Sequence, residues 1–159
     1  MPRKTKVFKK VWEKDPIFGS VFVTRLINQA MRDGKKTVAR KQVYNALAII
    51  KEKTKFDPIL VLEKALENIR PRVEVRSRRV GGAAYQVPSI VRGERQDSVA
   101  LKWIISFSRK RPNKEYHTFA EKLAAELIDA FNGIGGAIAK KQEVEKIADS
   151  NKAFAHLRW

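Results

Sequence analysis

The sequence predicts a mainly α fold: a six-helix bundle with an inserted, projecting two-stranded β-hairpin, in a single domain covering residues 1–159. Three observations support this prediction. Apolar residues recur at helical spacing in six segments. One segment, residues 72–92, instead alternates apolar and polar side chains around a Gly-Gly pair, which is typical of a hairpin. The connections are short, and no repeat or second domain is evident.

Two helices are expected after a basic N-terminal arm. The arm, residues 1–14, leads to a turn at residues 15–20 that ends on Ser20, a residue type that caps helix N-termini. The first helix is expected to end near Gly34, and the second to begin at about Thr37. Their apolar stripes consist of Val23, Leu26, Ile27, Ala30, Met31, Ala39, Val43, Ala46, Leu47 and Ile50.

The third helix is expected to begin at Asp57-Pro58. Aspartate caps a helix N-terminus, and proline suits the first helical position. Pro71 ends the helix because it cannot donate a backbone hydrogen bond. The apolar stripe consists of Ile59, Leu62, Leu66 and Ile69.

The segment with the hairpin pattern is rich in arginine. Residues 70–95 hold seven arginines and no lysine, with two glutamates as their only acids. Val73 and Val75 alternate with polar residues before Gly81-Gly82. Two strands alone are marginally stable in water, and so much like charge opposes folding. We therefore expect this hairpin to meet a dense phosphate partner.

Three helices are expected after the hairpin. The fourth begins at Asp97 or Ser98, and its apolar stripe includes Trp103, which we expect in the core. The fifth ends in a glycine-rich loop. The sixth spans about residues 137–150, and a tail, residues 150–159, follows it.

The overall charge supports an anionic partner. The chain has a formal net charge of +17, and six of its first 14 residues are basic against one acid. Such a charge opposes compaction unless a polyanion offsets it. The absence of cysteine excludes disulfides and thiolate metal sites, and no apolar run approaches the ~20 residues that span a bilayer. These features favour an RNA-binding module over a membrane protein.

Enzyme chemistry has little support. Residues 34–37 lack the first glycine and the preceding strand of a phosphate-binding loop. His117 and His156 have no partner at ligand spacing. Three acids of the fifth helix are expected on its solvated face: Glu121, Glu126 and Asp129. We therefore predict no catalytic residue, no metal site and no cofactor.

The arginines favour nucleic-acid contact, since their planar groups bind phosphates or base edges with two hydrogen bonds. Charge on a ribbon also discourages edge-to-edge aggregation. The clusters at residues 109–111 and 140–141 fit RNA contact or ordinary helix-end charge equally well. Tyr85, and Trp159 beside Arg158, are placed to reach a partner. No aromatic-rich motif for stacking bases is present, so we expect recognition of RNA shape and backbone.

Six stretches carry a resemblance to a known family. They are RPRVEVRSRRVGGAAYQVP at 70–88, DPIFGS at 15–20, MRDGKKT at 31–37, ALENIRP at 65–71, ALKWI at 100–104 and NKAFAHLRW at 151–159. They occur in the family's order and are spread along the chain from residue 15 to residue 159. The sequence closely resembles the bacterial-type family of ribosomal protein seven of the small subunit.

The resemblance implies a structural constituent of the ribosome, cytoplasmic and located in the small ribosomal subunit. It implies a primary rRNA-binding protein that docks on the 3′ major domain of small-subunit rRNA and nucleates assembly of the subunit head. It also implies a place at the subunit interface, where the hairpin contacts or obstructs exit-site tRNA and the mRNA path. Neighbouring ribosomal proteins of the head and platform are further implied partners. The resemblance implies neither a membrane nor a small-molecule substrate as a partner.

Matching positions imply which residues contact rRNA. They are Arg3, Lys4, Lys9, Lys10, Lys35, Lys36, Arg76, Arg78, Arg79, Arg92, Arg95, Lys102, Arg109, Lys110 and Arg111, and the arginine-rich segment adds Arg70 and Arg72. Near tRNA or mRNA, the resemblance implies Gly81, Gly82, Ala83, Lys140 and Lys141, and position in the chain adds Tyr85, Arg158 and Trp159. Asp97 departs from the family's usual basic run, which implies one weaker phosphate contact.

Two other functions stay open. An architectural DNA-binding protein uses arginine-rich β-arms to clasp a minor groove, although such arms carry an apolar wedge where this tip has glycine and alanine. A basic chaperone or scaffold without nucleic acid is the second alternative. Competition between the rRNA domain and duplex DNA distinguishes the DNA-binding alternative from rRNA binding. Experiments in nuclease-treated extracts distinguish the chaperone or scaffold alternative, which needs no nucleic acid.

Overall fold

The computed structural model describes residues 12–157 and shows six α-helices, one hairpin and one short 3-10 helix within them. The predicted contact residues Arg3, Lys4, Lys9, Lys10, Arg158 and Trp159 lie outside the described residues. In chain order the elements are α1 (Val21–Ala30), α2 (Lys36–Thr54), α3 (Pro58–Ile69), β1 (Val73–Val80), β2 (Ala83–Ile90), α4 (Glu94–Lys110), α5 (Phe119–Phe131), α6 (Gly136–Ser150) and the 3-10 helix η1 (Lys152–Leu157). The prediction of a mainly α fold with an inserted hairpin is confirmed.

The first helix begins where expected but ends earlier. Ser20 caps α1, because its side-chain oxygen accepts a hydrogen bond from the Phe22 N–H at 3.3 Å. The helix ends at Ala30, so the predicted end near Gly34 is wrong. Asp33 and Gly34 have φ values of +51° and +71°, which a right-handed helix cannot include.

The boundaries of α2 and α3 follow the predictions closely. The start of α2 lies within one residue of the predicted one. Asp57 caps α3 by accepting a hydrogen bond from the Ile59 N–H at 3.1 Å, and Pro58 occupies the first turn. The helix ends just before Arg70-Pro71, as predicted.

The start of α4 differs from the prediction. The helix begins at Glu94, so neither Asp97 nor Ser98 is its cap. Gly93, with φ +56° and ψ −137°, makes the turn into the helix without any capping side chain. The Asp97 carboxylate is instead used to bind two arginines, as described below.

The C-terminal elements match the predictions apart from the tail. A capping box starts α5, since Thr118 Oγ1 accepts from the Glu121 N–H at 3.2 Å and the Glu121 carboxylate accepts from the Thr118 N–H at 3.3 Å. The bounds of α6 agree with the prediction to within one residue. The segment predicted only as a tail contains η1.

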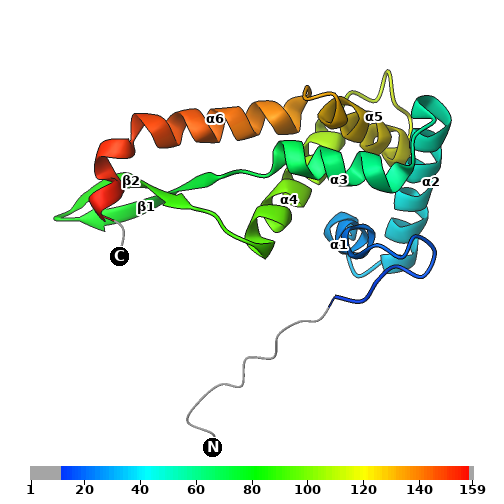
Figure 1. Ribbon diagram of the computed structural model, residues 1–159, viewed down its shortest axis with the longest axis horizontal. Coiled ribbons are helices and arrows are strands. Elements are labelled where there is room, and N and C mark those ends of the chain that lie inside the picture. Colours follow the sequence, from blue (N-terminus) through cyan, green and yellow to red (C-terminus); the bar gives the residue numbers. More distant parts are fainter. Residues whose placement is uncertain (1–11, 158–159) are drawn as a thin grey trace, which may run out of the picture.

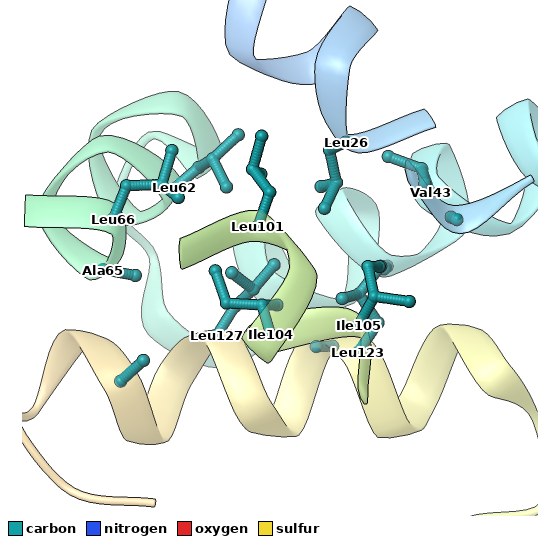
Figure 2. Close-up of a cluster of buried hydrophobic side chains, with 14 of the residues drawn as sticks. Leu26, Val43, Leu62, Ala65, Leu66, Leu101, Ile104, Ile105, Leu123 and Leu127 are labelled. Carbon is teal, nitrogen blue, oxygen red and sulfur yellow. The ribbon is translucent and has the colours of Figure 1, made fainter. Parts of the chain in front are cut away.

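The hydrophobic core lies between α1, α2, α3, α4 and α5, and α5 packs against three of the others. Leu123 and Leu127 of α5 face Ile104 and Ile105 of α4 (Figure 2). Burying each such side chain stabilises the fold by about 1.5–3 kcal/mol. Trp103 is partly buried against this core, as predicted. None of the helices within residues 12–157 is long and apolar enough to cross a membrane.

The hairpin extends away from the bundle (Figure 1). Its strands are antiparallel in a register that pairs Val80 with Ala83, so Gly81 and Gly82 alone form the turn. Both glycines have positive φ values, +58° and +88°, as two-residue hairpin turns require. No residue of either strand belongs to the core cluster of the described chain.

The hairpin is braced by the elements that end the described chain. In Figure 1, α6 runs beside the strands and η1 lies across them. The Tyr85 ring of β2 and the Phe154 ring of η1 are 5.1 Å apart between centroids. Val87 of β2 is only 2% exposed. The ribbon therefore has support that two isolated strands would lack.

Candidate nucleic-acid interface

Cations follow the hairpin from its base to its tip. Arg76 and Arg79 of β1 are exposed, and Arg78 between them is half-buried. Arg72 and Arg92, which flank the two strands, are also exposed. The glycine turn at the tip is exposed and has open space around it. The hairpin thus presents positive charge along its length and a small, uncharged end.

Glu74 joins the base of the hairpin to the start of α4. Its carboxylate accepts hydrogen bonds from Arg76 Nε at 2.6 Å and from Arg95 Nη2 at 2.7 Å. Partial burial disfavours the charged form of Glu74, but the bonds from Arg95 and Arg76 outweigh this effect and hold its pKa below the ordinary value. Two arginines from different elements are therefore held side by side.

A second carboxylate holds the point where the hairpin leaves the bundle. Asp97 of α4 pairs with Arg25 of α1 at 3.0 Å and with Arg70 at 2.6 Å. Arg25 is only 7% exposed and also donates to the Glu94 carbonyl at 2.9 Å and to Ser98 Oγ at 3.0 Å. Arg70, predicted to contact rRNA, thus has part of its hydrogen-bonding capacity used inside the protein.

A third cluster joins α4, α5 and α6. Arg111 pairs with Glu126 at 2.7 Å and with Asp129. The Glu126 side chain is 2% exposed and also accepts from the Ala137 N–H at 3.0 Å, in the first turn of α6. The expectation that Glu126 lies on a solvated face is therefore wrong, because the end of α4 and the start of α6 cover it. Arg111 also lies within 5.5 Å of the Tyr116 ring centroid.

Two predicted cations meet beside the α1–α2 loop. Lys35 and Arg109 line one cavity together with Arg32, a residue that no sequence pattern indicated. Arg109 donates to the Ala30 carbonyl at 2.9 Å, which fixes its guanidinium against the end of α1. Three further predicted cations are exposed on helices: Lys36, Lys102 and Lys110.

Of the residues predicted near tRNA and mRNA, those that the structure describes lie along the hairpin and α6. Lys140 pairs with Glu143 at 2.9 Å, and Lys141 donates to the Asn68 carbonyl at 2.8 Å. Tyr85, which was expected to reach a partner, contacts the Phe154 ring of η1 within the protein. The tip residues Gly81, Gly82 and Ala83 are exposed.

The structure brings the predicted cations together in two places and leaves others apart. One group lies at the hairpin and the start of α4, and another lies around the α1–α2 loop and the end of α4. The sequence does not reveal the roles of Arg25, Arg32 and Glu74, because each involves at least one neighbour distant in sequence: Asp97, Arg109 and Arg95, respectively. Across residues 12–157, no three histidine or carboxylate side chains gather in a way that would hold a metal ion.

Comparisons with known proteins identify the family. The family model described as "Ribosomal protein S7p/S5e" matches residues 2–152. The relatives include proteins of Carboxydothermus hydrogenoformans (53% identical), Desulforudis audaxviator (51%) and Rhodococcus opacus (50%), each aligned over 159 residues and 100% of both chains, and each named small ribosomal subunit protein uS7. These are structural ribosomal proteins rather than enzymes. The chain therefore belongs to the ribosomal protein S7p/S5e family.

Proposed function

We propose that this small-subunit ribosomal protein binds the 3′ major domain of small-subunit rRNA directly and nucleates assembly of the subunit head. The observation that carries the proposal is the arrangement of exposed arginines on a fixed frame. Glu74 holds Arg76 of β1 beside Arg95 of α4, so two elements present their charge to one partner. Charge placed in this way suits the converging phosphates of folded RNA better than a uniform surface coat.

The frame supports this role energetically. A binding surface that is already ordered loses less conformational entropy on association than a flexible one. Asp97 fixes the hairpin base to α1 and α4, and Glu126 fixes the start of α6. The cations therefore neutralise phosphates of several rRNA segments while the rigid bundle holds those segments in one arrangement.

Binding of the full chain to a 3′ major-domain transcript, in competition with duplex DNA of equal length, tests the proposal. With about six to ten phosphate contacts, log affinity should fall with log salt at a slope of roughly −0.7 to −0.9 per contact. The transcript should win the competition at every salt concentration. A nearly flat salt response, or equal affinity for the DNA, would contradict the proposal, and a preference for DNA would favour an architectural role.

The hairpin is proposed to act by position, obstructing exit-site tRNA and lying beside the mRNA path. The supporting observation is its exposed, uncharged tip at the end of a braced ribbon that contributes nothing to the core cluster. Ribosomes carrying a deletion of residues 78–84 should release exit-site tRNA faster or lose reading-frame fidelity. A double Arg78→Ala, Arg79→Ala variant keeps the length and separates the effect of charge from that of obstruction. If the deletion lowers the unfolding midpoint of the bundle sharply, the tip is structural and this part fails.

A further inference from the structure

Three cations surround one cavity of about 280 Å³ at the junction of α1, α2, α4 and α5. They are Arg32 and Lys35 of the α1–α2 loop and Arg109 of α4. In the described part of the chain, none of the three forms an ion pair with a carboxylate. Burial, and then the nearby charge of Arg32, lower the pKa of Arg109. Like charges held together without an acid point to an anion from outside the protein.

The rest of the cavity wall is apolar and aromatic. Phe119, at the start of α5, lies 5.9 Å from the Arg109 guanidinium carbon to the ring centroid. Val38 is 55% exposed and, with Ala39, forms the α2 side of the wall. A surface that binds only phosphate has no need of these groups. A flat ring, by contrast, is well accommodated by a phenyl ring, a guanidinium plane and an exposed valine.

Gln42 and the N-terminal end of α2 add hydrogen-bond donors to the cavity. Gln42 lines the cavity, and its Oε1 accepts from the Ala120 N–H at 3.2 Å, so its amide N–H groups are left to donate. The helix α2 begins beside the cavity without a side-chain cap and without an acid in its first turn. The partial positive charge of that helix end reinforces the three cations.

The geometry points to a pocket for one unstacked nucleotide of the bound RNA, with its base against Phe119 and Val38 and its phosphate among Arg32, Lys35 and Arg109. This inference rests on the proposed rRNA function and specifies a different mode of contact, since it adds a base to the phosphate contacts. The volume lies at the small end of ligand pockets, so it suits a single nucleotide and not a duplex. Bases splayed out of loops and bulges are the usual targets of specific RNA recognition.

Four variants of the full chain test the inference, with affinity for the 3′ major-domain transcript measured at several salt concentrations. Phe119→Leu removes the ring and keeps an apolar side chain, so affinity should fall about ten-fold with an unchanged salt slope. Phe119→Tyr keeps the ring and should bind as the natural chain does. Arg32→Ala should lower affinity and reduce the salt slope by about one contact, roughly 0.7–0.9. Lys53→Ala, an exposed lysine at the other end of α2, is the matched control.

The outcomes separate this inference from the proposed function. If the natural chain prefers the transcript over DNA but Phe119→Leu binds equally well, the pocket does not hold a base and only this inference fails. If the natural chain shows no such preference, both fail. Binding of polyglutamate, a model of an acidic protein, is measured for the same variants. If Phe119→Leu loses polyglutamate binding but keeps its RNA affinity, the pocket binds an acidic protein and the inference of a nucleotide pocket fails. Adenosine monophosphate is also tested as a competitor of the RNA. If it displaces the RNA from the natural chain but not from Phe119→Leu, the pocket binds a free nucleotide and the inference of an RNA nucleotide fails. Thermal unfolding of each variant confirms that the fold is intact.

Discussion

At the scale of single residues, half-buried carboxylates fix the positions of several arginines. Asp97 holds Arg25, which is 7% exposed, and Arg70 at the base of the hairpin. A charge that is this deeply buried is tolerated only because its partner neutralises it. Asp97 therefore ties the hairpin base to α1 and α4, and we expect it to affect RNA binding only through that position.

Replacing Asp97 by alanine should destabilise the protein by about 3 kcal/mol, because the Arg25 guanidinium would be left buried without its carboxylate. Urea unfolding measures the change. The matched control is Glu143→Ala, which removes an acid that is 56% exposed and paired with Lys140 on the surface of α6. That change should cost less than about 1 kcal/mol. Equal losses for the two variants would mean that the Asp97 pairs are not structural.

Glu74 predicts a dependence of stability on pH. Its pKa is lowered in the folded protein from 4.5, so its stabilising effect is fully present above 4.5 and is lost as the pH falls through the lowered native value. The natural chain should therefore be more stable than Glu74→Gln by up to about 1 kcal/mol at neutral pH. Urea unfolding across the acid range should show this difference shrinking below 4.5. A constant difference would contradict the assignment.

These ion pairs explain which parts of the site the sequence could not predict. Arg25 and Asp97 are 72 residues apart, Arg70 and Asp97 are 27 apart, and Arg111 and Glu126 are 15 apart. No local pattern shows that such residues meet. The density of arginine in residues 70–95 is a local property, so the cationic hairpin could be predicted from the sequence, whereas the acids that orient its side chains could not.

At the scale of secondary-structure elements, local signals predicted the helices well where a cap or a proline sets the boundary. Ser20 and Asp57 each make the expected capping hydrogen bond. The two misplaced boundaries are the end of α1, where Met31 leaves the helical conformation three residues before Gly34, and the start of α4, where Gly93 makes the turn without a capping side chain. The sequence shows a glycine but not its φ value, which depends on how the flanking elements pack.

The contact between η1 and β2 predicts a local effect on the hairpin. Replacing Phe154 by alanine removes its ring contact with Tyr85, which is worth about 0.5–1.5 kcal/mol beyond the buried area. Backbone amides of β2 near Tyr85 should then exchange with deuterium faster, while those of the core helix α5 should be unchanged. Ile17→Ala, a change at a residue that is 68% exposed, is a control that should affect neither. Faster exchange throughout the bundle would mean that η1 supports the whole fold.

At the scale of the whole molecule, a chain of 159 residues carries a net charge of +17. Internal ion pairs use only some of the cations, so mutual repulsion opposes folding when no polyanion is present. The same repulsion is what rRNA phosphates relieve on binding. Stability and affinity should therefore respond to salt in opposite directions.

Adding salt should stabilise the free protein while it weakens RNA binding. Raising the salt from about 0.01 to 0.15 M shortens the screening length from about 30 to 8 Å. If this relieves about 1 kcal/mol of repulsion, Tm should rise by about 2–4 °C, as measured by calorimetry. A Lys51→Gln, Lys53→Gln variant, altered at two exposed lysines of α2, should show a smaller rise. A falling Tm would indicate that attractive pairs outweigh repulsion.

The Tyr85–Phe154 contact has a consequence for the order in which a newly made copy matures. Domains fold as the chain emerges during translation, and residues 152–157 follow every other described element. A nascent chain that has emerged only as far as α5 has its core helices but an unsupported ribbon. Among the described elements the hairpin thus gains its support last, and we expect a growing polypeptide to compete for rRNA less well than a finished one.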